Sequence, residues 1–183
     1  MKLCDNLFFL RHLRTENNAN NVISGQSDAR IIQEASYQID LNLFDKIYCS
    51  PSLRCIETIK LIDNNFDGLN NIVYDRRLLE RSMGLLEGLP KSESKRKYPE
   101  LFLRGAFNVF RTPPQGECFE SFQQRIQEIY NDLLNENRQR NILVCSHNQT
   151  LKLLRLMVLD KEVTQQSWIE FSFKNGVITQ IKR

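Results

Sequence analysis

Long apolar runs, a strong net charge and closely spaced cysteine pairs are all missing from this sequence. No apolar stretch approaches the ~20 residues of a membrane-spanning helix, and the N-terminal MKLCDNLFFLRH lacks the apolar core and cleavage site of a signal peptide. The net charge of +3 and the scattered Lys and Arg residues argue against a nucleic-acid-binding groove. We therefore expect a cytoplasmic protein that binds neither membrane nor nucleic acid.

Cysteines are few and follow no ligand pattern. The five thiols are odd in number and scattered, and no CxxC pair suggests zinc or thioredoxin-type redox chemistry. We expect reduced thiols that pack as small hydrophobic side chains. The five residues are Cys4, Cys49, Cys55, Cys118 and Cys145.

Length and composition are those of a globular protein. The chain has 183 residues, of which 41% are hydrophobic and 26% charged, and domains cluster near ~100 to 200 residues. Residues 81–114 differ from the rest because they hold four of the five prolines, with several charges and aromatic residues. We predict one domain over residues 1–183, with 81–114 as an insertion that covers one end of the sheet.

Short apolar runs alternate with helical patterns, which is typical of βαβ units and a largely parallel sheet. At the C-terminus, SWIEFSFKNGVITQIKR predicts two strands around an Asn175-Gly176 hairpin turn. The sequence therefore indicates an α/β fold whose mostly parallel sheet ends in an antiparallel edge. The apolar runs are Leu7–Leu10, Lys46–Cys49, Ile72–Tyr74 and Ile142–Cys145.

Three helices are predicted. In SPSLRCIETIKLI, Ser50 is a candidate N-cap and Pro51 occupies the first helical position. Residues 119–133 carry one apolar stripe at spacings of three and four. NQTLKLLRLMVL begins polar, directly after ILVCSH, and then becomes densely apolar, as expected of a helix packed on a sheet.

The two histidines of the chain each follow an apolar run, His12 in FFLRH and His147 in LVCSH. The carboxyl ends of parallel strands line a ligand crevice, so both imidazoles are expected at one site. Arg11 precedes His12, and Arg54 lies in the first turn of a predicted helix. Such clustered positive charge destabilises a fold unless an anion binds there, and the guanidinium fork matches phosphate or carboxylate.

A carboxyl group is expected at the same edge. Glu80 comes soon after the run that ends at Tyr74. A carboxylic acid kept protonated by burial can donate its proton to a leaving alkoxide. A solvated surface charge is the alternative interpretation of Glu80, and Glu87 is a second candidate for the acid.

Five segments of the chain resemble the histidine phosphatase superfamily, in its phosphoglycerate-mutase-like branch. They occur in the family's order and cover most of the chain. The resemblance implies a three-layer α/β/α sandwich with the active site at the carboxyl ends of the strands. The segments are LRHLRTENNANNVISGQSD, YCSPSLRCIETI, LLERSMGLLEG, PPQGECFESFQQRI and ILVCSHNQT.

The resemblance also implies catalytic roles. It makes His12 the nucleophile that becomes phosphorylated and Glu80 the acid. Arg11 and Arg54 would hold the phosphoryl oxygens, and His147 would donate to the same group. Phosphoryl transfer of this kind depends on positioning and charge neutralisation. We expect hydrolysis of a small phosphorylated metabolite, with no metal and no cofactor.

Further positions match residues that line the family's pocket. They are Thr15, Asn18, Ser24 and Gly25, and the backbone N–H of Asn148 at a helix start would add an anion-binding dipole.

Three positions depart from the family's pattern. Leu13 and Asn148 stand where glycine usually follows each histidine, and Cys118 stands where serine is usual. We expect Leu13 and Asn148 to narrow the pocket, which leaves the substrate open. Some side chains of the covering segment could contact the leaving group of the substrate. The alternative is that they are solvated or pack in the protein. They are Arg104, Arg111, Phe102, Phe107 and Phe110.

Three other functions match parts of this sequence. A cysteine-dependent phosphatase needs five residues between its nucleophile and its arginine, whereas Cys49 and Arg54 are separated by four. A phosphoglycerate-type mutase usually carries a longer insertion than the segment from Arg81 to Gln115. A phospho-ligand- or protein-binding module without turnover is disfavoured by the complete set of catalytic residues. The sequence predicts no oligomeric state.

Overall fold

A five-stranded sheet forms the centre of the molecule, with the strand order β3-β2-β6-β1-β7. The computed structural model describes residues 6–32, 38–63, 71–136 and 140–182. The first four strands in this order are parallel, and β7 pairs antiparallel with β1 at one edge, as predicted. The strands are β1 (Leu7–Arg11), β2 (Lys46–Cys49), β3 (Ile72–Tyr74), β6 (Ile142–Ser146) and β7 (Ile178–Ile181).

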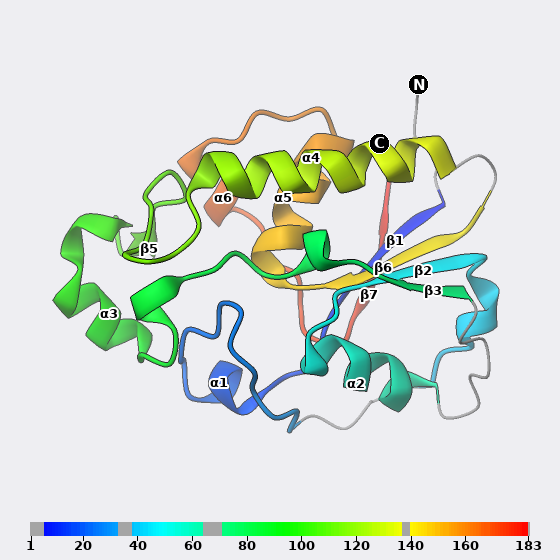
Figure 1. Ribbon diagram of the computed structural model, residues 1–183, viewed down its shortest axis with the longest axis horizontal. Helices are drawn as coiled ribbons and strands as arrows, with labels where there is room; N and C mark the ends of the chain where they lie inside the picture. The colour runs from blue at the N-terminus through cyan, green and yellow to red at the C-terminus, as the bar shows by residue number, and fades with distance from the viewer. Residues whose placement is uncertain (1–5, 33–37, 64–70, 137–139, 183) are drawn as a thin grey trace.

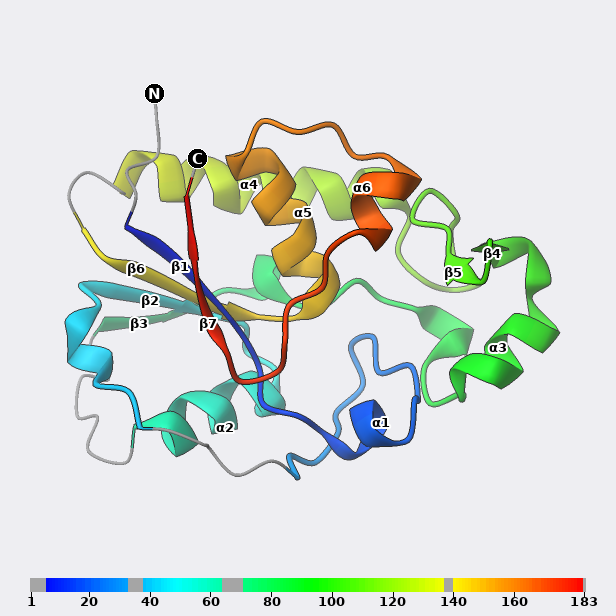
Figure 2. The ribbon, with the colours of Figure 1, turned by 180° about the vertical axis from the view of Figure 1, so that it is seen from behind.

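Helices cover both faces of the sheet (Figures 1 and 2). On one face lie α4 (Phe119–Glu136) and α5 (Asn148–Val158), with α6 (Gln165–Ile169) beside them. On the other lie α2 (Leu53–Ile62) and the single-turn α1 (Glu16–Ala19). The predicted three-layer sandwich is therefore confirmed. Among the described residues, no helix has the length and apolarity needed to span a bilayer.

Alternation of side chains along the strands builds two cores. In β6, Ile142 and Val144 pack with residues of α4 and α5. Leu143 and Cys145 point the other way and pack with residues of α2. All five residues of β6 are buried, because a central parallel strand is covered on both faces.

Two of the predicted helices lie where the sequence placed them. The apolar stripe of α4 is buried over its whole length, and α5 begins directly after His147. Both helices pack in the core that contains Phe9 and Val144. The buried stripe consists of Phe119, Phe122, Ile126, Ile129 and Leu133.

The predicted start of α2 is wrong. The helix begins at Leu53 with Ser52 in the N-cap position, so Ser50 does not cap it and Pro51 is not its first residue. Ser50 directly follows β2, and its backbone N–H donates to the carbonyl of Cys145 at 2.9 Å. Its hydroxyl lies 2.9 Å from Nε2 of His147.

The predicted C-terminal hairpin is also wrong. In its first half, residues 167–169 belong to helix α6, which starts with a capping box between Thr164 and Ser167, and residues 170–174 form no strand. Only the second half is a strand, and β7 pairs with β1 rather than with its predicted neighbour. Gly176 makes the turn in the left-handed region, with φ of 68°, and its N–H donates to the carbonyl of Arg11.

Residues 81–114 extend beyond the sheet at one end of the molecule (Figure 2). They contain α3 (Lys91–Lys97) and a two-stranded ribbon of β4 (Phe102–Leu103) and β5 (Ala106–Phe107). The treatment of this segment as an insertion in a single domain stays a prediction. The 3-10 turns of the molecule include Leu41–Leu43, Arg76–Leu78, Gly84–Leu86 and Pro99–Leu101.

The cysteines of the described residues are free thiols. Cys49, Cys55 and Cys145 are buried, and Cys118 is partly exposed. This agrees with the prediction of reduced, hydrophobic thiols. Cys4 lies outside the described residues.

Truncation of the α4 stripe should destabilise the fold. Ile126→Ala removes a fully buried side chain, and such changes cost about 2–5 kcal/mol through lost burial and the cavity left behind. Urea unfolding measures the loss. Gln123→Ala, at an exposed position of the same helix, is the matched control and should change stability little; equal losses in both variants would contradict the packing described.

Candidate active site

A cavity of about 570 Å³ lies at the carboxyl ends of the parallel strands. The structure brings eight of the ten predicted site residues to its wall and leaves Thr15 and His147 out of it. The eight come from distant parts of the chain. They are Arg11, His12, Asn18, Ser24, Gly25, Arg54, Glu80 and Asn148.

His12 directly follows β1 and is only 4% exposed. Its Nδ1 lies 2.7 Å from the carbonyl oxygen of Leu13. A carbonyl only accepts hydrogen bonds, so Nδ1 carries the proton and Nε2 keeps its lone pair when the ring is neutral. The fold therefore holds His12 in the tautomer that leaves Nε2 free to attack an electrophile.

His147 directly follows β6, and its ring centroid lies 5.3 Å from that of His12. Its Nδ1 accepts a hydrogen bond from Nε of Arg54 at 3.1 Å, so Nε2 donates to the hydroxyl of Ser50 at 2.9 Å. The ring is buried behind Arg54 and does not line the cavity. In this structure His147 thus orients Arg54 rather than pointing a donor at the cavity.

Arg54 makes three hydrogen bonds to residues that the structure describes. Besides its bond to His147, its Nη1 donates to the carbonyl of Ser27 at 2.6 Å and its Nη2 to that of Gly25 at 2.7 Å. A guanidinium has five N–H donors, so two remain for a ligand. Arg54 is 1% exposed yet lines the cavity, where those donors can meet an anion.

Arg11 has a buried donor without a partner. Its Nη1 donates to the carbonyl of Phe173 at 2.8 Å, whereas its Nε is buried and has no hydrogen-bond partner among the described residues. An unpaired buried donor costs about 1–3 kcal/mol. A phosphate or carboxylate bound beside His12 is the kind of group that would remove this cost.

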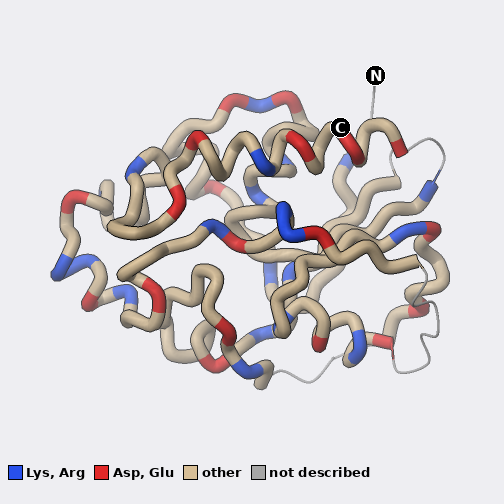
Figure 3. The backbone as a smooth tube through the Cα atoms, viewed as in Figure 1, with Lys and Arg blue, Asp and Glu red and all other residues tan. Residues whose placement is uncertain are grey.

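Positive charge dominates the cavity. Within the described part of the chain, its wall carries six cationic side chains and one carboxylate, that of Glu80. Figure 3 shows the basic residues of α3 at the end of the molecule beyond the sheet. Such a field favours an anionic ligand. The cations are Arg11, Arg14, Arg54, Lys91, Lys95 and Lys152.

The same environment keeps both imidazoles neutral. Burial, with the nearby charges of Arg54 and Arg11, lowers the pKa of His12 from its ordinary value to about 3. Burial and the same guanidinium groups hold the pKa of His147 well below its ordinary value. A neutral imidazole is the nucleophilic form, so His12 is competent to attack at physiological pH.

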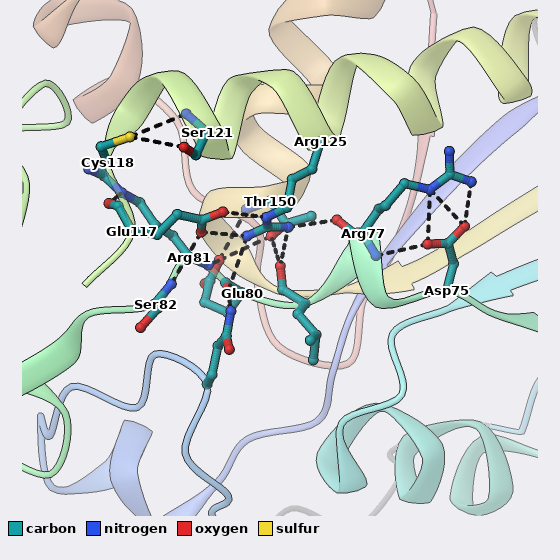
Figure 4. Close-up of polar contacts among 12 residues, drawn as sticks. Asp75, Arg77, Glu80, Arg81, Ser82, Glu117, Cys118, Ser121, Arg125 and Thr150 are labelled. Carbon is teal, nitrogen blue, oxygen red and sulfur yellow. Dashed lines mark hydrogen bonds and ion pairs between the residues drawn. The ribbon is translucent and has the colours of Figure 1, made fainter. Parts of the chain in front are cut away.

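Glu80 is anchored at the N-terminus of α5. Its Oε2 accepts from the N–H of Gln149 at 3.1 Å, and its Oε1 accepts from the N–H and the hydroxyl of Thr150, both at 3.2 Å. Arg125 donates to the Glu80 carbonyl and also pairs with Glu117 at 2.6 Å (Figure 4). We expected the N–H of Asn148, at the helix start, to bind an anion. Instead, the N–H groups of the next two residues bind the Glu80 carboxylate.

Glu87, the rival candidate for the acid, does not line the cavity. Its carboxylate accepts from the backbone N–H groups of Gln26, Ser27 and Met83. It therefore fixes the loop that carries Gly25. A Cβ on Gly25 would lie 2.1 Å from the Glu87 carboxylate, so this close approach requires glycine.

Two predictions about the cavity wall are wrong. The hydroxyl of Thr15 caps α1 in a capping box with Asn18, and its side chain is fully buried. Leu13 packs in the core beside α2 and does not narrow the cavity, because its side chain points away from the site. Asn148 does line the cavity, and its Oδ1 accepts from the N–H of Phe173.

Only some of the residues expected to contact the leaving group line the cavity. Phe102 and Phe107 line the cavity, whereas Phe110 packs against Phe119. Neither Arg104 nor Arg111 is among the described residues of the wall. Cys49 is fully buried and also absent from it, which agrees with the exclusion of a cysteine nucleophile.

Sequence reasoning missed several residues of the site. Ser50 was assigned to a helix cap although it bonds to His147. Gln149 and Lys152, on α5, and Trp168, on α6, line the cavity. A signal for Lys152 was present, since a residue four positions after Asn148 lies on the same face of a helix.

Comparison with known proteins identifies the family. The profile of the histidine phosphatase superfamily (branch 1) matches residues 7–183. The chain belongs to this superfamily. A 2,3-bisphosphoglycerate-dependent phosphoglycerate mutase of Cytophaga hutchinsonii is 28% identical over 85% of this chain and 77% of its own. A broad-specificity phosphatase of Saccharomyces cerevisiae, YOR283W, is 28% identical over 82% and 72% of the two chains.

Solved structures that are similar to this chain share its fold. Bacillus stearothermophilus YhfR superposes with a TM-score of 0.79 at 24% identity, over 94% of this chain and 88% of that one. The α-ribazole phosphatase of Shigella flexneri gives a TM-score of 0.72 at 21% identity, over 94% and 87%. At these identities the likeness supports the fold alone.

Acid should destabilise this protein through its histidines. The pKa of His12 is lower in the folded protein than in the unfolded chain. The contribution of the two neutral imidazoles to the free energy of unfolding is therefore complete above about pH 6.5. It is lost as the pH falls, by up to about 1.4 kcal/mol per pH unit for each imidazole. Urea unfolding between pH 6.5 and 5 measures this slope. His12→Asn should reduce the slope, and an unchanged slope would contradict the depressed pKa.

Proposed function

We propose that the protein is a phosphatase that hydrolyses a small phosphorylated metabolite in the cytoplasm through a phosphohistidine on His12. One observation carries the proposal most directly: a neutral His12 with Nε2 free, beside an Arg11 whose Nε has no partner among the described residues. Arg54 supplies the second guanidinium. The set fits a tetrahedral dianion, and the proposed chemistry uses no metal and no cofactor.

In the first step, Nε2 of His12 attacks phosphorus and the bond from phosphorus to the ester oxygen breaks. Arg11 and Arg54 neutralise the charge on the phosphoryl oxygens. The electron pair of the broken bond stays on the leaving oxygen, which takes a proton from Glu80. His147 acts as a positioning residue, because it fixes the guanidinium of Arg54 through Nδ1.

Glu80 is the acid because, among the described residues, it is the one carboxyl group on the cavity wall. Its carboxyl oxygens are held in place by the N–H groups of Gln149 and Thr150 at the start of α5. In this role Glu80 supplies the proton that the leaving oxygen needs.

In the second step, the Glu80 carboxylate takes a proton from water as the water oxygen attacks phosphorus. The phosphorus–nitrogen bond breaks, and its electron pair returns to Nε2 of His12. Inorganic phosphate leaves, and both residues regain their starting protonation states. This step separates a hydrolase from a mutase, which must return the phosphoryl group to a sugar acid before water reaches it.

A mutase is the second candidate, because proteins named phosphoglycerate mutases are among its relatives. One, from Bradyrhizobium diazoefficiens, is 30% identical over 85% of this chain and 81% of its own. The short covering segment favours the hydrolase. Release of phosphate from p-nitrophenyl phosphate, compared with isomerisation of 3-phosphoglycerate, separates the two, and a protein that turns over neither is a binding module.

Replacement of the nucleophile should abolish turnover. His12→Asn is expected to form no acid-labile, base-stable phosphoenzyme, because it lacks the attacking nitrogen. Rapid quench with labelled substrate measures this intermediate. His147→Asn, which keeps His12, is the control and should still be labelled, more slowly; a label that persists in His12→Asn would place the nucleophile elsewhere.

Replacement of the acid should affect poor leaving groups most. Glu80→Gln is expected to slow hydrolysis of an alkyl phosphate by roughly 100-fold, the scale of general-acid catalysis. p-Nitrophenyl phosphate should lose much less, because nitrophenolate leaves without a proton. Comparison of kcat/KM for the two substrates tests this. Equal losses on both would remove Glu80 from the acid role.

A further inference from the structure

Lys152 is a buried cation that the chemistry proposed above does not use. It lies on α5, lines the cavity and is 8% exposed. Its Nζ lies 4.9 Å from the centroid of the Trp168 ring. Within residues 6–32, 38–63, 71–136 and 140–182, no carboxylate lies within ion-pair distance of it.

A buried ammonium group without an anion is costly. Desolvation of an ion is costly even after the protein relaxes, and a cation–π contact offsets only part of that cost. Trp168 therefore does not fully compensate Lys152. An anionic ligand in the cavity would provide the missing partner.

A second polar atom on the same face of α5 also lacks a partner. Gln149 precedes Lys152 by three residues, so the two side chains lie on one side of the helix, and both line the cavity. Oε1 of Gln149 is buried with no hydrogen-bond partner among the described residues. This oxygen accepts hydrogen bonds, so it suits a hydroxyl or amine donor of the ligand, beside the group that Lys152 binds.

The phosphoryl group does not account for Lys152. Arg11 and Arg54 already flank His12, and Lys152 approaches the cavity from another element, beside Trp168 of α6. The other lysines of the wall, Lys91 and Lys95, lie on α3 and are more exposed than Lys152, although burial also lowers the pKa of Lys91. Lys152 is the lysine that gains most from a bound anion.

We propose that Lys152, supported by Trp168, is a specificity-determining residue that binds a second anionic group, a carboxylate or a further phosphoryl group, on the leaving portion of the substrate. This deepens the hydrolase proposal and rests on it. The preferred substrates are phosphomonoesters of acids, or bisphosphates. Simple phosphorylated alcohols are poorer substrates.

The charge state of Lys152 gives the proposal a pH signature. Burial lowers its pKa to about 8, with Glu80 raising it and Arg11 lowering it. The ammonium form is therefore lost between pH 7 and 9. Arginine at the same position keeps its charge over this range.

Two matched ligand pairs test the proposal. 3-Phosphoglycerate differs from glycerol 3-phosphate in a carboxylate, and fructose 1,6-bisphosphate differs from fructose 6-phosphate in a phosphoryl group. The wild type should favour the more anionic member of at least one pair by roughly 10- to 100-fold in kcat/KM, as for a charge-assisted contact. The pair that responds identifies which anion Lys152 binds.

The variants separate a role in specificity from a structural one. Lys152→Met should abolish the preference, with a smaller loss of kcat/KM on p-nitrophenyl phosphate than on the more anionic substrate, and its Tm should equal or exceed that of the wild type because an uncompensated buried charge is removed. Lys152→Arg should keep the preference at pH 9, where the wild type loses it. Lys60→Met, at an exposed position of α2, should change neither property.

Each outcome bears on one proposal. The inference is overturned if, for both pairs, the ratio of kcat/KM between the two substrates is the same in the wild type and in Lys152→Met. A loss of Tm in that variant with the same unchanged ratio would mean that Lys152 is structural. Ligand binding tests the role of Lys152 even if the hydrolase proposal fails. If nothing is hydrolysed, yet the more anionic ligand raises the Tm of the wild type further and Lys152→Met removes the difference, the inference stands alone.

Discussion

The positive charge of Arg11 and Arg54, packed against two imidazoles, is the interaction on which the rest of this site depends. Burial, reinforced by this charge, lowers the pKa of His12 and keeps its ring unprotonated, and the Leu13 carbonyl fixes which ring nitrogen carries the proton. Clustered like charges cost stability unless an anion binds among them. The cluster lies where β1 and β6 end, so it lowers the stability of the unliganded protein there. A bound phosphoryl group would offset this repulsion.

Arginines also organise the loops around the cavity. Arg54 joins the carbonyls of two residues from a distant loop, and Arg11 holds the C-terminal segment through the carbonyl of Phe173. Arg81, fully buried, donates to three carbonyls of the segment that follows it. Arg125 supports the backbone at Glu80. Charged side chains thus serve here as backbone clamps as well as ligands for an anion.

Much of this arrangement could be predicted from the sequence. The four parallel strands and the stripe of α4 follow from local periodicity, and convergence of His12 and His147 follows from the rule that parallel strands end at one edge. The roles of Thr15 and Leu13 could not be predicted, since a side chain's direction depends on tertiary packing. The hairpin prediction failed because residues 167–169 continue the helix that begins at the Thr164 capping box, residues 170–174 form no strand, and β7 pairs with β1 instead. Lys152 was missed because its helix looked uniformly buried.

The tautomer and charge of His12 are the most direct test of this account. The chain has only two histidines, so nitrogen-detected NMR of the ring nitrogens is readily assigned with a His12→Asn variant. The account predicts a neutral ring, protonated at Nδ1, from pH 8 down to about 4, in line with a pKa of about 3. An imidazolium at pH 7, or a neutral ring protonated at Nε2, would contradict it.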